Sequence, residues 1–101
     1  MATTTKALFR GAATTSTGTT LYTVPSATTA VVTNIVVSNT AASTSTVTVF
    51  LDGVNVIPTA SIAANSVALF DMKQVLGTTK TITGGASTTA VTIHVSGVEI
   101  A

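Results

Sequence analysis

Residues 28–39 form the longest stretch of this 101-residue chain that is dominated by β-branched side chains. The stretch carries no charge, and neither glycine nor proline interrupts it. Because branching at Cβ restricts χ1, such side chains suit a pleated strand better than a helix. Alternation places Val31, Ile35 and Val37 on one face and Val32 on the other. Since both faces carry apolar residues, the pattern predicts a central strand that is at least partly covered on both sides.

A second alternating stretch leads into Asp52-Gly53, a two-residue hairpin signal. Both central positions of a type I′ turn need a positive φ, which Asp and Gly tolerate. Such a loop would pair Leu51 with Val54 and Val49 with Val56, and it would place all four side chains on one face. The apolar pattern and the turn therefore predict the same register.

The remaining turn signals recur at a spacing of about ten residues, which is typical of a sandwich or barrel. Pro58 is expected to end the strand after the hairpin, and Gly84-Gly85 is expected to form a flexible turn. A bulge at Gly97 would return Val98 and Ile100 to the inward face of the last strand. Besides residues 28–39 and the strand that follows Gly53, strands are predicted at residues 6–10, 20–24, 45–51, 67–70, 80–83 and 89–95. The expected core consists of Ile35, Val37, Val49, Leu51, Leu69, Val91, Ile93 and Val95.

One short segment, Met72–Leu76, has the signals of a helical turn. Asp71 can cap it, Gln74 sits at the third helical position, and Gly77 follows its end. We therefore expect an all-β fold, a single antiparallel β-sandwich of jelly-roll or Ig-like type. It would have about seven to eight strands and one short helical turn.

Composition narrows the class of protein. Charged residues make up 7% of the chain, against about 25% in a typical soluble domain. The hydrophobic content of 46% argues against a disordered Thr/Ser linker. With a net charge of +1 and no cysteine, the chain has neither a basic patch for nucleic acid nor a disulfide framework. We expect one domain over residues 1–101, with no export signal and no membrane span.

The sequence offers little chemistry. His94 is the only histidine, and a catalytic base would need a nucleophile and an orienting acid beside it. Asp52, Asp71 and Glu99 each have a structural explanation, as turn, helix cap and terminal strand residue. One His and three acids are too few for a transition-metal site. We therefore expect no enzyme, and no catalytic, cofactor-binding or metal-ligating residues.

Two surface features point to association instead. Natural sheets protect their edge strands with Lys, Pro, bulges or inward charges, and this chain has few charges to do so. The edges should therefore be prone to pairing. Residues 1–5 read as a flexible N-terminal arm that docks onto a neighbouring subunit. The candidate partner-interface residues are Ala2, Thr3, Thr4, Thr5 and Lys6. There are two alternatives to association. Phe9, Tyr22, Phe50 and Phe70 could form a stacking platform, although core or interface packing is preferred. The Thr/Ser excess could form a glycan-binding or ice-binding face, although ordinary exposed strand positions are preferred.

Four segments together resemble the small virion proteins of tailed bacteriophages. They are Leu21–Pro25, Ala30–Asn39, Val47–Gly53 and Val91–Ile100. The resemblance covers most of the chain from Leu21 onward, and it implies a β-sandwich module on the capsid surface or in a tail or fibre. It carries over no functional residues, because the family has no catalytic motif.

Three hypotheses of function remain, and only the first is the expectation. The first is a capsid decoration or cement protein that stabilises the phage head by bridging capsomers. It would be made in the host cytoplasm, be located in the virion, and bind the major capsid protein or another virion protein. A symmetric homo-oligomer is expected because a sandwich of this size leaves about a third of its chain surface exposed and its charge-poor edges need covering. The resemblance implies that the oligomer is a trimer at local three-fold positions of the shell. The second is a receptor- or glycan-binding module of a tail or fibre, and the third is an enzyme. Small size favours the first over the second.

Overall fold

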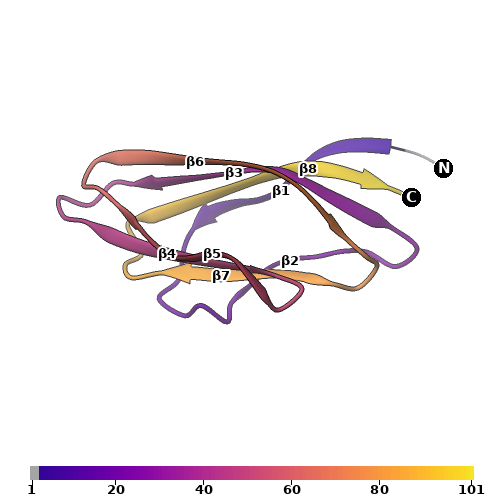
Figure 1. Ribbon diagram of the computed structural model, residues 1–101, viewed down its shortest axis with the longest axis horizontal. Helices are drawn as coiled ribbons and strands as arrows, with labels where there is room; N and C mark the ends of the chain where they lie inside the picture. Colours follow the sequence, from indigo (N-terminus) through magenta and orange to yellow (C-terminus); the bar gives the residue numbers. More distant parts are fainter. Residues whose placement is uncertain (1–2) are drawn as a thin grey trace.

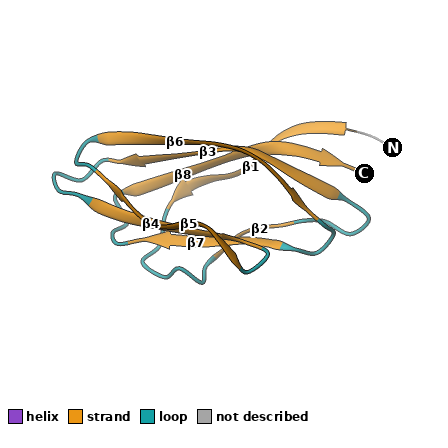
Figure 2. Cartoon of the chain, in the orientation of Figure 1, coloured by secondary structure: helices purple, strands orange, loops and turns teal. Residues whose placement is uncertain are grey.

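The computed structural model describes residues 3–101, which fold into two layers of β-strands (Figure 1). No helix occurs among these residues (Figure 2). The strands are β1 (Thr3–Ala12), β2 (Thr20–Thr23), β3 (Thr29–Asn39), β4 (Ser45–Leu51), β5 (Val54–Ile62), β6 (Ser66–Leu76), β7 (Thr81–Ala86) and β8 (Val91–Ile100). The predicted all-β antiparallel sandwich is confirmed.

The strand order identifies the topology. Sheet A has the order β1-β8-β3-β6 and sheet B the order β2-β7-β4-β5. The pairs β1/β8, β2/β7, β3/β6 and β4/β5 are all antiparallel, as in one long hairpin. Rolling that hairpin up brings β3 beside β8 and β4 beside β7. Of the two topologies expected, this arrangement is the jelly roll. The predicted central strand is β3, which lies between β8 and β6.

The tip of the rolled hairpin is the predicted two-residue turn. Asp52 has φ of 54° and Gly53 has φ of 75°, as a type I′ turn requires. Leu51 lies opposite Val54, which confirms the register at the turn. Leu51 is buried, whereas Val54 is 68% exposed because it begins an edge strand.

Further from the turn, the predicted register is wrong. An extra residue at Val56 leaves Val49 opposite Ile57, and Ile57 takes the inward position with 1% exposure. Pro58 does not end the strand. It lies inside β5 next to Thr59, whose φ is 45°, at a second irregularity in the pairing with β4. Because β5 is an edge strand, a proline there removes no hydrogen bond from the interior of the sheet.

A similar irregularity in β3 changes which side chains face inward. Thr33 is an extra residue relative to β8, so the alternation on either side of it is out of phase. Val32 and Ile35 are therefore both fully buried, and Val31 faces outward. The prediction that Val31 shares a face with Ile35 and Val37 is wrong for this reason.

Gly97 does not form the predicted bulge. The extra residues lie in its two neighbours, at Leu8 in β1 and at the irregularity of β3 described above. A Cβ on Gly97 would lie 2.3 Å from the carbonyl oxygen of Val31 and 2.9 Å from Cδ1 of Leu8. Val98 pairs with the outward-facing Val31, so Val98 and Ile100 do not return to the inner face. Glycine is needed at position 97 because any larger side chain would clash with the neighbouring strands β1 and β3.

The predicted helical turn at Met72–Leu76 is also wrong, because β6 continues as a strand to Leu76. In this conformation Leu76 pairs with Ala30 and is 2% exposed. A helix of five residues is unstable without packing, whereas the strand pairs with β3 along its whole length. Asp71 consequently lies in the strand opposite Asn34 and caps nothing.

Gly84 and Gly85, predicted as a turn, lie buried inside β7. A Cβ on Gly84 would lie 2.5 Å from the carbonyl oxygen of Thr48, and one on Gly85 would lie 2.3 Å from that of Ser16. The loop between β1 and β2 runs directly against β7 at this point, because the backbone N–H of Ala86 donates to the carbonyl of Thr14. The glycines therefore permit a close approach of backbones.

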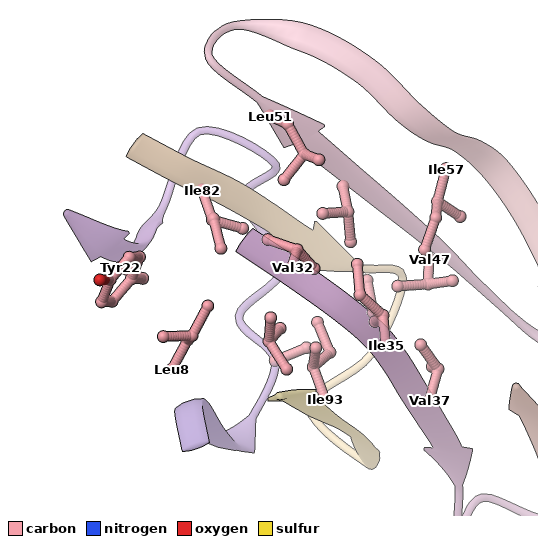
Figure 3. Close-up of a cluster of buried hydrophobic side chains, with 14 of the residues drawn as sticks. Leu8, Tyr22, Val32, Ile35, Val37, Val47, Leu51, Ile57, Ile82 and Ile93 are labelled. Atoms are coloured by element: carbon pink, nitrogen blue, oxygen red, sulfur yellow. The ribbon is translucent and has the colours of Figure 1, made fainter. Parts of the chain in front are cut away.

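The core fills the space between the sheets, where Leu51, Ile57 and Val47 of sheet B face Val32, Ile35 and Val37 of sheet A (Figure 3). Seven of the eight predicted core residues are buried. The exception is Leu69, which is 71% exposed because it points outward from the edge strand β6.

Truncating Ile35 to Ala should lower the free energy of unfolding by about 2–5 kcal/mol, because the fully buried side chain leaves a cavity. Val54→Ala is the control and should change it by less than about 0.5 kcal/mol. Urea denaturation of both variants measures the difference. Equal effects would show that Ile35 is not a core residue.

Gly97→Ala should destabilise the domain by about 1–3 kcal/mol, because the new Cβ meets backbone that cannot move freely. Gly77→Ala is the matched control, since a Cβ there would meet nothing nearer than 4.0 Å. Thermal unfolding followed by circular dichroism compares the two. A Gly97→Ala protein as stable as the Gly77→Ala protein would contradict the crowding at Gly97.

Candidate functional site

The predicted partner-interface residues lie at the N-terminal end of β1. Thr3–Thr5 pair with Val98–Ile100 of β8, so the expectation of a free arm is wrong for these residues. A strand with exposed side chains forms there because β8 extends far enough to pair with it. Ala2 lies outside the described residues. Contact of Thr3–Thr5 and Lys6 with a neighbouring subunit stays a prediction.

Lys6 belongs to a polar cluster within its own chain. Its Nζ lies 3.4 Å from both carboxylate oxygens of Glu99. Tyr22 donates its hydroxyl to Oε2 of the same carboxylate. The cluster therefore joins β2 of sheet B to β8 and β1 of sheet A. Sequence reasoning missed it, because the residues are far apart along the chain and no motif connects them.

The cluster shifts the titration of both acids. The Tyr22 hydroxyl bond and the charge of Lys6 hold the pKa of Glu99 below its usual range, although partial burial opposes them. Burial and the neighbouring Glu99 raise the pKa of Tyr22 well above its usual value. The phenol consequently stays a neutral donor and Glu99 a charged acceptor. This arrangement is structural, since it holds two sheets together and its carboxylate is already occupied.

The other candidate groups for chemistry are dispersed. His94 lies on the outer face of sheet A between Val36 and Arg10. Asp52 stands at the hairpin tip, 3.8 Å from Lys80 Nζ, in an exposed ion pair that contributes little stability. Within residues 3–101 no three metal-ligating side chains gather closely enough to hold an ion. Since that part of the chain contains no helix, it has none that is long and apolar enough to cross a membrane.

Asn39 is a second residue whose role sequence reasoning missed. Its side chain is buried, and its amide nitrogen donates to the carbonyls of Ser43, Ile62 and Ala63. Its Oδ1 accepts from the backbone N–H of Ala41. The amide therefore ties the end of β3 to the loop after it and to the turn between β5 and β6. A buried amide with this many partners is an element of the scaffold and not a free ligand group.

The outer faces of the two sheets differ in chemistry. On sheet A, aliphatic side chains of β3, β6 and β8 form what we call the aliphatic face. Leu69 is 71% exposed and Val75 is 68% exposed, while the other members are half-buried. The face consists of Val31, Val36, Leu69, Val75, Val98 and Ile100. These residues form two groups, one of Val31, Val75, Val98 and Ile100 and the other of Val36 and Leu69, and Asn34, Asp71 and Ser96 lie between the groups. Exposed aliphatic side chains on one face indicate a contact surface.

On sheet B the outward positions of β4 and β7 are mostly threonines, which we call the threonine face. They alternate with buried residues and comprise Thr46, Thr48, Thr81 and Thr83, with Phe50 among them. The aromatic residues do not form the stacking platform considered above. Tyr22 is buried and Phe9 and Phe70 pack against the core, which leaves Phe50 on this face.

An open hollow of about 490 Å³ lies on sheet A beside the aliphatic face. Its lining includes the hydroxyls of Thr33 and Ser96 and the cationic residues Lys6 and Arg10. The hollow lies where β1 and β3 carry their extra residues. Since Lys6 already pairs with Glu99, the hollow offers no pair of unoccupied cations for an anion.

The edges of the sheets are better protected than the sequence suggested. Edge strand β1 carries Lys6, Arg10 and the irregularity at Leu8. Edge strand β2 has four residues, and β5 carries Pro58 and two irregularities. The expectation of unguarded edges is therefore wrong for three of the four edge strands. The least protected edge is β6, which has Lys73 and one irregularity in its pairing with β3 but is 11 residues long without Gly or Pro.

The Glu99 cluster predicts a dependence of stability on pH. Because the pKa of Glu99 is lowered in the folded state, its contribution is complete above the unfolded value of about 4.3 and is lost as the pH falls through the folded value. Tyr22→Phe should raise the pKa of Glu99 toward 4.3, about the unfolded value, and reduce the loss of stability in acid. Carboxyl titration by NMR in both proteins measures it. A Glu99 that titrates at its usual value in the wild type would contradict the cluster.

A comparison with known protein families found no family model that matches the chain, and a search of curated proteins found no similar sequence. Its function therefore has to be argued from its own surfaces.

Proposed function

We propose that this protein is a structural virion protein, a decoration or cement protein that stabilises a phage head by bridging capsomers. The observation that carries the proposal is the aliphatic face of sheet A. Burying Leu69, Val75 and the half-buried valines beside them would remove apolar surface from water, which is the main driving force for protein association. The resemblance to small phage virion proteins is the reason for proposing that the assembly to which it binds is a phage head.

The distribution of polar groups supports a binding role without catalysis. The titratable residues either pair within the chain, as Lys6 and Glu99 do, or stand apart, as His94 and Asp71 do. A nucleophile, a base and an orienting acid would have to converge for catalysis. A rigid two-layer domain with an apolar outer face is instead suited to cover a seam between other proteins.

The partners are then the major capsid protein, or another virion protein, and further copies of the chain itself. Sheet A would face the shell, and contacts between copies would join neighbouring capsomers. The trimer expected from the resemblance stays a prediction, since it depends on the three-fold positions of the shell.

One observation favours the second function, a glycan-binding module of a tail or fibre. The threonine face is rich in hydroxyls and includes Phe50, and jelly rolls serve in lectins as well as in viral capsids. Sugar binding usually adds aromatic side chains to such a face, however, and the other aromatics lie in or against the core. The aliphatic face therefore gives the stronger proposal.

Binding to undecorated heads tests the proposal. Val36→Lys puts an unpaired charge beside Leu69 on the aliphatic face and should weaken attachment at least about tenfold, since desolvating a charge is costly. Thr48→Lys, on the threonine face, is the matched control and should bind as the wild type does. Co-sedimentation with heads measures both, after circular dichroism has verified folding.

Salt provides a second readout of the same experiment. Because the residues of the aliphatic face are uncharged, and Asp71 and Lys73 beside them have opposite charges, attachment should change little when NaCl rises from about 0.05 M to about 0.5 M, where exposed charges are screened. Attachment that moderate salt abolishes, or that Thr48→Lys weakens more than Val36→Lys, would contradict the proposed surface. Binding to a glycan array without binding to heads would favour the second function.

A further inference from the structure

Strand β6 has an open edge. It is the last strand of sheet A, with β3 on one side and, within residues 3–101, no strand on the other. Its 11 residues contain neither Gly nor Pro, and every second side chain from Val67 to Val75 is exposed on the outer face. Its pairing with β3 has one irregularity, at Met72 and Lys73. An edge of this kind leaves backbone N–H and C=O groups available for another strand.

The outward-facing side chains of β6 form a symmetric sequence. They are, in order, Val67, Leu69, Asp71, Lys73 and Val75, and all of them are exposed. The last four are placed symmetrically about Met72, whereas Val67 would lie opposite Gly77, beyond the end of the strand. Around Met72 as the centre, an acid faces a base and an apolar residue faces an apolar residue. An antiparallel copy of the same strand would therefore meet its own complement.

We propose that β6 pairs antiparallel with β6 of a second copy of this chain, about a two-fold axis at Met72. In this register Asp71 lies opposite Lys73 of the partner subunit, and Leu69 lies opposite the partner's Val75. Each contact occurs twice because a two-fold interface is self-complementary. Directly opposed unlike charges and apolar pairs are the combinations that stabilise antiparallel strands.

The charges select this register over its neighbours. A two-fold axis at Asp71 would set that carboxylate opposite its own copy, and an axis at Lys73 would set two ammonium groups together. Like charges in direct opposition destabilise a strand pair. A slip by a single residue would oppose outward side chains to inward ones. Among these registers, the axis at Met72 alone neutralises both charges.

The dimer would join two sheets of type A into one sheet of eight strands, with the two aliphatic faces side by side. This two-fold contact is an alternative to the three-fold contact that the resemblance implies, and the oligomeric state of the protein distinguishes the two. The pairing does not depend on the proposed role in a phage head. A dimer that fails to bind heads would overturn that role alone, and a monomer that binds heads would overturn the pairing alone.

Charge reversal tests the pairing. Sedimentation equilibrium should find the wild type dimeric, and Asp71→Lys or Lys73→Asp alone should raise the dissociation constant at least about tenfold by opposing like charges. The Asp71→Lys/Lys73→Asp double variant should restore the dimer. An equimolar mixture of the two single variants should form heterodimers, because each then meets the opposite charge. Arg10→Asp, on the far edge strand β1, is the control and should leave the dimer unchanged.

Cross-linking tests the register, and the chain has no native cysteine to interfere. Under mild oxidation, a mixture of the Leu69→Cys and Val75→Cys variants should give a disulfide-linked heterodimer, whereas each variant alone should give little product. A wild type that stays monomeric at about 100 µM, a trimer, or a dimer indifferent to both charge reversals would overturn the proposal. Efficient cross-linking of Leu69→Cys to itself would overturn the register.

Discussion

The fold depends on one antiparallel pairing that begins at the Asp52-Gly53 turn and continues outward through all eight strands. Each strand before the turn pairs with the strand at the same distance after it, from β4 with β5 to β1 with β8. Rolling this ribbon brings β3 beside β8 and encloses the core between two sheets. Because the pairing is continuous, an extra residue in one strand must be accommodated by its neighbours. Gly97 provides that room in sheet A, where Leu8 and Thr33 are the extra residues.

These irregularities also determine the surfaces. The extra residue at Thr33 buries Val32 and turns Val31 outward, next to Val75 and Val98. Without it, alternation would point Val31 into the core with Ile35 and Val37. Sheet B, in contrast, presents threonines, whose hydroxyls keep its outer face polar without charge. The chain thus combines a low net charge with two chemically distinct faces, and the apolar one supports a role in assembly.

Much of the fold could be predicted from local patterns. The turn at Asp52-Gly53 follows from the φ values those residues tolerate, and the burial of Ile35 and Ile93 follows from alternation. The irregularities could not be predicted, because they arise from the fit between strands that are distant in sequence. The capping signals around Met72–Leu76 are local and favour a helical turn, but pairing with β3 stabilises the extended strand instead. Leu69 was misplaced because alternation alone does not say which face of an edge strand is covered.

The candidate site was harder to predict than the fold. The proposed N-terminal arm lacked apolar residues, which suggested a free segment, yet pairing of its backbone with β8 needs no apolar side chain. Tyr22, Lys6 and Glu99 come together because three strands end at the same end of the sandwich. No spacing rule connects such residues. The symmetry of β6 around Met72 is visible in the sequence, but it has a meaning only once β6 is known to be an outer strand with one open edge.

The most direct test of the assembly role is the position of the chain in an electron-microscopy map of its particle. The account predicts jelly-roll density on the outside of the head, with the aliphatic face of sheet A against the capsid protein. Density at the tip of a tail fibre, or contact with the shell through the threonine face, would contradict it.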